Sequence, residues 1–196
     1  YWNDKLSAAY LTLEWFKPLI EKGENYKKLY EKLEPLAEAT SCWDIFTWKN
    51  LGNNPKEVLL KKRALSINSA EKILGAGAFY NFITKKLGCE NYTEEIFNYF
   101  FLLDEAYNLK IDNLFDFAKR VINDFDYKGS KIGVIYGIDG DYQSIIADKI
   151  LFDKKLSYEV VAFLSVYGTV SFRSKNNIDV SDIAKKLGMM LGYSGG

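Results

Sequence analysis

The chain has 196 residues, with 26 Lys and Arg against 26 Asp and Glu, so its formal net charge at pH 7 is zero. This balance argues against attachment to nucleic acid or membrane by bulk charge, while a local basic pocket stays compatible with it. Apolar residues make up 48% and charged residues 27%, which is typical of a soluble globular chain of one or two domains. No apolar stretch reaches the roughly 20 residues that a membrane-spanning helix needs.

The sequence contains no histidine. These residues therefore cannot form a Ser-His-Asp triad, a Cys-His pair or a His-ligated metal site. The two cysteines, Cys42 and Cys89, form no zinc-binding pattern, and we expect reduced thiols in a cytoplasmic protein. The sequence begins at Tyr1 and stops within a glycine-rich phrase, so we expect the protein to continue at both ends.

The first two thirds of the chain show the apolar spacing of amphipathic helices. Ser7 suits the N-cap of the first helix, and Pro35 is expected to kink or break the second. The predicted helices cover residues 6–20, 26–39, 55–65, 69–87, 93–103 and 111–125.

After residue 130 the pattern changes to short runs of β-branched and apolar residues. Strands are predicted at 132–136, 158–164 and 170–173, and helices at 142–152 and 180–187. Asp141 is the expected cap of the first of these helices. This order of elements predicts a small mixed sheet with helices packed on it.

The third predicted strand carries the best candidate for ligand binding. Its period of two places Val170 and Phe172 on one face, and Ser171 and Arg173 on the other, open face. Ser174 follows at the strand end. A planar guanidinium flanked by hydroxyls suits a phosphate group. The simpler alternative is an ordinary exposed arginine on a solvated sheet face.

The glycine-rich end of the chain, including Gly195 and Gly196, is a second candidate. Glycines after a helix allow consecutive backbone N–H groups to point at one anion. The alternative is a flexible glycine terminus.

A third candidate is Asp44, which lies among aromatic residues in the segment 42–48. A carboxylate in such surroundings can be a metal ligand or an acid with a shifted pKa. The alternative is a helix cap or a hydrogen-bonded buried group, with the aromatic side chains in the core.

Taken together, several segments of the sequence resemble a known family. The segments 132–137, 170–174 and 179–188, with a helix containing Ser144 between the first two, resemble the C-terminal, DHH-associated domain of the DHH phosphoesterases. Segments 7–12 and 43–49 resemble the end of that family's N-terminal domain. The superfamily is named for an Asp-His-His metal motif and includes RecJ-like exonucleases, oligoribonucleases, cyclic-dinucleotide phosphodiesterases and exopolyphosphatase-like proteins.

The resemblance implies an α/β fold in two parts. Residues 1–126 would be the C-terminal part of a DHH domain with a helical linker, and 127–196 an incomplete substrate-binding domain. It also implies a hydrolase with divalent metal ions, usually Mn²⁺, that acts on short oligonucleotides, cyclic dinucleotides or small phosphate esters. Metal-activated hydrolysis would be assisted by charge stabilisation on the phosphoryl oxygens.

Carried over to this sequence, the resemblance makes Ser171, Arg173 and Ser174 substrate contacts and Gly195-Gly196 the start of a glycine loop. Asp44 becomes the candidate metal ligand, although the register could instead place that ligand at Cys42.

The sequence also departs from the family pattern. The Asp-His-His motif is absent and would have to precede Tyr1, and the histidine that ends the glycine loop is missing. The alternative function is therefore a non-catalytic nucleotide-binding or regulatory relative that keeps Arg173. A helical interaction module with a small α/β appendage is a third hypothesis. We expect no membrane partner, and a homodimer is left open.

Overall fold

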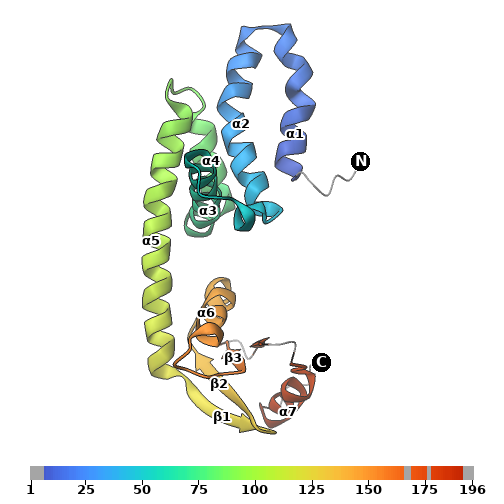
Figure 1. The fold of residues 1–196 in the computed structure, drawn as a ribbon, viewed down its shortest axis with the longest axis vertical. Helices are drawn as coiled ribbons and strands as arrows, with labels where there is room; N and C mark the ends of the chain where they lie inside the picture. The colour runs from blue at the N-terminus through green and yellow to red at the C-terminus, as the bar shows by residue number, and fades with distance from the viewer. Residues whose placement is uncertain (1–6, 166–168, 176–177, 192–196) are drawn as a thin grey trace. The chain divides into compact units, whose positions relative to one another are not determined.

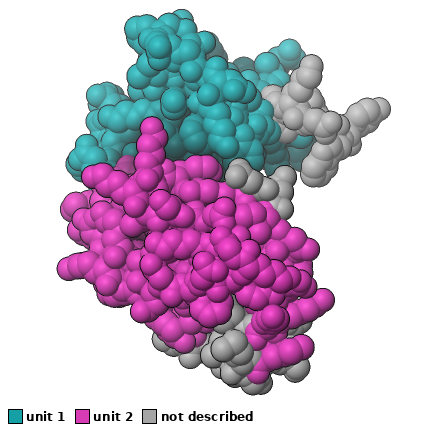
Figure 2. Space-filling model, turned by 60° about the horizontal axis from the view of Figure 1, so that its bottom comes forward, with its two compact units in different colours: residues 1–107 teal, residues 108–196 magenta. Residues whose placement is uncertain are grey.

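The computed structural model describes residues 7–165, 169–175 and 178–191. It confirms a mixed α/β chain, with helices through residue 121 and a sheet that begins at residue 123. The chain divides into two compact units, residues 1–107 and 108–196, shown in different colours in Figure 2. The division expected at 126/127 falls inside a strand of the second unit, and the division between the compact units falls inside a long helix.

The first unit is helical (Figure 1). The Ser7 hydroxyl accepts a hydrogen bond from the backbone N–H of Tyr10 at 3.4 Å, which confirms Ser7 as the N-cap of α1. Helices α1 and α2 lie side by side, and α2 packs against α3. The elements are α1 (Ala8–Phe16), η1 (Lys17–Lys22), α2 (Glu24–Asp44), η2 (Thr47–Asn50), α3 (Pro55–Leu74), α4 (Ala76–Lys86) and the first part of α5 (Tyr92–Val121).

Three helix boundaries differ from the sequence prediction. Pro35 lies inside α2 without breaking it, since the buried face that follows it packs on α3. The chain breaks instead at Gly75, whose φ of 74° suits the end of α3 and the start of α4. Helix α5 is continuous where two helices were predicted, because its middle contains no Gly or Pro and buries Tyr107 and Ile111.

The core of the first unit is built from α2, α3 and α5. Two of its alanines, Ala39 and Ala70, are fully buried, which allows close approach of the helices. Phe97 and Phe100 meet edge to face with their centroids 6.1 Å apart. The buried cluster consists of Leu36, Ala39, Ile67, Ala70, Tyr92, Ile96, Phe97 and Phe100.

The described part of the second unit contains a four-stranded sheet of order β1-β2-β3-β4. The pair β2/β3 is parallel, and the pairs β1/β2 and β3/β4 are antiparallel. The elements are β1 (Asn123–Tyr127), β2 (Ser130–Tyr136), α6 (Gly140–Phe152), β3 (Val160–Leu164), β4 (Val170–Ser174) and α7 (Ser181–Leu191).

Strand β1 was missed, because the prediction continued a helix to residue 125. Four of its five residues are exposed, so the strand buries no face of its own, and the sequence prediction assigned the start of its short alternation, from Asp124 to Tyr127, to the end of a helix. What fixes β1 is its pairing with β2, in which Phe125 lies opposite Ile132. The edge strand β1 is therefore stabilised by its hydrogen bonds to β2 and not by the apolar spacing of its own residues.

The sheet has helices on both faces. Phe172 of β4 packs with Ile183 of α7, around Ile132 and Val160. Arg173, the next residue of β4, points to the opposite face and contacts α6. All five residues of β3 are buried between these layers. Ser171 and Arg173 were expected on an open face, and both are exposed, although α6 packs on the same face of the sheet.

In the part of the chain that the structure describes, α5 and the other helices are each too short or too polar to cross a lipid bilayer.

Candidate functional site

A pocket of about 600 Å³ lies at the carboxyl ends of the parallel strands β2 and β3. The connection β2–α6–β3 brings the N-terminus of α6 to the same edge. In α/β sheets this edge is the usual place for a ligand, because loops open there and helix N–H groups point outward. The lining residues are Gly137, Ile138, Asp139, Gly140, Gln143, Leu164, Ser165, Thr169 and Ser171.

The turn from β2 into α6 forms one wall of the pocket. Gly137 has a φ of 82°, a conformation that favours glycine, and it turns the chain out of the sheet. The Asp139 carboxylate then accepts a hydrogen bond from the N–H of Asp141 at 3.3 Å and caps α6. Asp141 was the predicted cap, so the prediction is wrong by two residues. Gln143 Nε2 donates to the Ile138 carbonyl at 3.0 Å and braces the turn.

Hydroxyl groups form the opposite wall. Ser171 of β4 is exposed and lines the pocket, and its register partner on β3 is Phe163. Thr169 and Ser165 flank the β3–β4 connection, where the Ser165 N–H donates to the Thr169 carbonyl at 2.9 Å. The hydroxyls of Thr169, just before β4, and of Ser171, within it, can donate to one anionic or polar ligand.

Arg173 lies on the same face of β4 as Ser171 but is not part of the pocket lining. Two residues along a strand separate the two Cα atoms by about 7 Å, a distance that the long arginine side chain can span. The Arg173 Nη2 donates to the Ser144 hydroxyl of α6 at 2.6 Å. Among the described residues Arg173 forms no ion pair, so its charge is not neutralised by a neighbour.

Ser174 is placed differently. It belongs to the other face of β4, and its hydroxyl donates to the Ile178 carbonyl at 3.0 Å. The structure therefore brings Ser171 and Arg173 together and directs Ser174 into the turn that precedes α7. Gly195 and Gly196 lie outside the described residues.

Asp44 is the last residue of α2, in the first unit. The residue is exposed, while protein atoms around the carboxyl group partly exclude water and raise its pKa. A carboxylate at a helix C-terminus also meets the negative end of the helix dipole. Both effects disfavour the charged form of Asp44, and a cation beside it would relieve them.

The described residues contain no group of three or more His, Cys, Asp or Glu side chains that could hold a metal ion. Cys42, the alternative ligand position, is only 4% exposed and lies within the helical core. The residues present therefore do not form a metal centre by themselves, and Asp44 is at most one ligand of a site completed by other residues.

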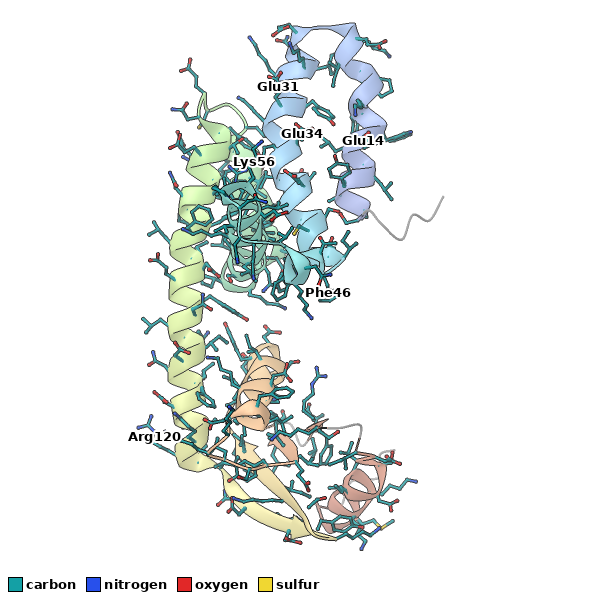
Figure 3. All side chains as sticks on the ribbon, in the orientation of Figure 1. Glu14, Glu31, Glu34, Phe46, Lys56 and Arg120 are labelled. Carbon is teal, nitrogen blue, oxygen red and sulfur yellow. The ribbon has the colours of Figure 1, made fainter. Side chains whose placement is uncertain are left out.

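An apolar groove of about 260 Å³ in the first unit was not predicted from the sequence. It lies between α1, η1 and α2, where Figure 3 labels Glu14, and its lining side chains are apolar or aromatic. Beside it the Tyr30 hydroxyl donates to Glu14 at 3.1 Å, and burial with this bond raises the pKa of Tyr30 to about 12. Nothing in this groove supplies acid–base or phosphate-binding chemistry.

No family model, curated protein or solved structure matches this chain.

Proposed function

We propose that the chain is part of a DHH-type phosphoesterase and that its second unit binds the substrate through the pocket at the β2/β3 edge. The substrate class is a phosphodiester or small phosphate ester, such as a short oligonucleotide or a cyclic dinucleotide. The observation that carries the proposal is a pocket lined by Thr169, Ser171 and the N-terminus of α6, with Arg173 on the same face of β4 and in no ion pair with another described residue.

The chemistry of the pocket favours a sugar phosphate over inorganic phosphate. Hydroxyls, helix N–H groups and a guanidinium all donate hydrogen bonds to phosphate oxygens. However, the carboxylates of Asp139 and Asp141 stand at the same helix terminus, and Asp139 lines the pocket. These charges repel a free dianion, whereas ribose hydroxyls can donate to them. A nucleotide with an internal phosphodiester, which carries one negative charge, suits both groups.

Manganese enters this proposal only through the resemblance. The described residues do not make a complete site for it, so the role that we assign to this chain is to bind and orient the substrate. Asp44 is the residue that we propose as a metal ligand, on the ground that its position at the end of α2 disfavours an unaccompanied carboxylate.

The second candidate function is a nucleotide-binding relative without catalysis. The burial of Cys42, the alternative ligand position, is the observation that favours it. It shares the pocket and the role of Ser171 with the first candidate and differs only in turnover.

The test compares ligands in calorimetry with EDTA present, so that no metal-dependent turnover occurs. We expect the dinucleotide pApA to bind, inorganic phosphate not to bind, and Ser171→Ala to weaken pApA by about 2- to 10-fold, the loss of one hydrogen bond. Ser130→Ala, at the opposite end of β2, is the matched control. Hydrolysis of pApA after addition of Mn²⁺ supports the enzyme, and binding without hydrolysis supports the relative. If pApA does not bind, both are wrong.

A further inference from the structure

The turn that links α2 to η2 carries an aromatic side chain under backbone strain. Phe46 has φ 58° and ψ 17°, the left-handed region where helix ends usually place Gly or Asn. The N–H of Phe46 donates to the Trp43 carbonyl at 3.0 Å, a bond that any residue at this position except proline can make. A glycine would therefore serve this backbone at lower energy.

The Phe46 side chain does not compensate for that strain by burial. It is 57% exposed, at the position labelled in Figure 3. An aromatic ring that is both strained and solvated adds little to folding stability. Strained backbone conformations cluster at sites that position a side chain for a ligand, so the conformation of Phe46 indicates a binding role for this turn.

The residues around Phe46 form a cluster, which we call the aromatic turn and define as Trp43, Phe46, Trp48 and Lys49. The indoles of Trp43 and Trp48 stack nearly parallel, with centroids 5.6 Å apart and an angle of 8°. The Lys49 ammonium lies 5.0 Å from the Phe46 centroid and 5.5 Å from the Trp48 centroid. The N–H of Lys49 donates to the Phe46 carbonyl at 3.2 Å and holds the turn closed.

The Trp48 Nε1 is a second destabilising feature of the same turn. It is buried and has no hydrogen-bond partner among the described residues. A buried unpaired donor disfavours the folded state, as the strained backbone of Phe46 does. The aromatic turn therefore carries two features that disfavour folding: the left-handed backbone of Phe46 and the unpaired Nε1 of Trp48.

We propose that the aromatic turn is a nucleobase-stacking site, at which a base lies on the Phe46 ring and Lys49 meets the adjoining phosphate. Single-stranded nucleic acids are bound in this way, by aromatic faces with a cation beside them. The inference rests on the proposed function, because it takes the ligand to be an oligonucleotide, and it assigns a base-binding role to the first unit.

The surroundings of Phe46 favour a base over an apolar protein partner. Its neighbours Asp44, Thr47 and Lys49 are exposed and polar, while Trp43 and Trp48 are half-buried, so Phe46 is the exposed aromatic ring of a turn whose other exposed side chains are polar. Protein partners require a contiguous patch of several hundred Å². One flat face beside one ammonium group matches a nucleotide.

The experiment measures binding of two fluorescein-labelled RNA pentamers by anisotropy in EDTA: pentaadenylate, and an abasic pentamer with the same phosphates. Phe46→Gly should weaken pentaadenylate about 5- to 150-fold, the range for loss of one stacked base, and leave the abasic pentamer unchanged. Phe46→Trp should retain binding within about threefold. Lys49→Gln should weaken both pentamers to a similar extent, since it acts on phosphate.

Two controls separate a binding role from a structural one. Tyr80→Ala removes another exposed aromatic ring of the first unit, 66% exposed on α4, and should change neither affinity. Phe46→Gly should also raise the Tm, or at least not lower it, because glycine relieves the left-handed strain. A lower Tm for Phe46→Gly would overturn the inference by showing that the ring stabilises the fold.

Equal binding of pentaadenylate by Phe46→Gly and wild type would refute the stacking site and leave the proposed function standing. If neither pentamer binds the wild-type protein, the stacking site fails, and the proposed function is decided separately by the pApA titration. Loss of pentaadenylate binding confined to Phe46→Gly and Lys49→Gln, with Tyr80→Ala unaffected, supports the inference.

Discussion

Arg173 provides the sharpest test of the second unit. Its guanidinium is exposed, donates to the Ser144 hydroxyl at 2.6 Å and has no ion-pair partner among the described residues. Removal of an exposed side chain with one hydroxyl contact should leave the Tm nearly unchanged. If the group contacts a phosphodiester, its removal deletes a charge-assisted hydrogen bond worth about 1.5–3 kcal/mol. Arg173→Ala should therefore weaken pApA binding by about 10- to 150-fold.

The Ser144 contact makes a graded series of variants informative. Ser144→Ala keeps the charge of Arg173 but frees its side chain, and ordering a free side chain costs about 0.5–1.5 kcal/mol on binding. We therefore expect about a 2- to 12-fold loss of affinity. Arg173→Lys keeps the charge and loses the planar fork, so its affinity should lie between that of wild type and Arg173→Ala.

The assay is calorimetric titration of pApA in EDTA, with thermal unfolding of each variant alongside. Arg120→Ala is the matched control, since it removes the same charge from α5 in the same unit, at the position labelled in Figure 3. Its guanidinium contacts only the Asp116 carbonyl among the described residues, at 3.3 Å. Equal loss of pApA affinity in Arg173→Ala and Arg120→Ala would show that only the net charge of the protein matters. That result would refute our placement of the phosphate beside Arg173.

Two further predictions concern stability. At Gly133 an added Cβ would lie 2.3 Å from Ile122 Cδ1 and 3.2 Å from the Tyr158 ring. Gly133→Ala should therefore lower the free energy of unfolding, measured by urea titration, by about 1–3 kcal/mol. An unchanged urea midpoint would contradict this and show that the Ile122 side chain rotates away from the added methyl group. Burial raises the pKa of Tyr30, Tyr92 and Tyr158 each to about 12. A raised folded-state pKa gives stability that is complete below the ordinary value of about 10 and is lost as the pH rises toward 12, so the Tm should fall across that window. Ionisation of all 14 tyrosines near pH 10 with the fold intact would contradict this.

The candidate site was partly foreseeable. The period of two placed Ser171 and Arg173 on one face of β4, as the structure has them. Their surroundings were not foreseeable, since Ser144 lies 29 residues from Arg173 and meets it only because α6 packs on that face. The pocket wall from Gly137 to Gly140 arises where β2 and β3 pair in parallel, which is a tertiary event.

The strain at Phe46 illustrates another limit. A bulky residue rarely takes a left-handed conformation, so no local preference predicts one at the end of α2. The stack of Trp43 on Trp48 and the hydrogen bond from Thr47 Oγ1 to the Cys42 carbonyl, at 3.3 Å, accompany that turn. The sequence pattern pointed to Asp44, or alternatively Cys42, as a metal ligand and to the aromatic side chains as core residues.

The sequence by itself determined the elements whose residues carry their own signal. The β-branched runs of β2 and β3, the Ser7 cap and the amphipathic helices follow from local sterics and apolar spacing, which need no distant partner. Only the tertiary structure decided β1, the unbroken course of α2 through Pro35 and the helix on the face of Arg173. Each of these depends on a neighbouring segment that supplies a strand partner, a packed surface or a hydrogen bond. The stabilising free energy of such contacts depends on where distant segments of the chain lie in the fold.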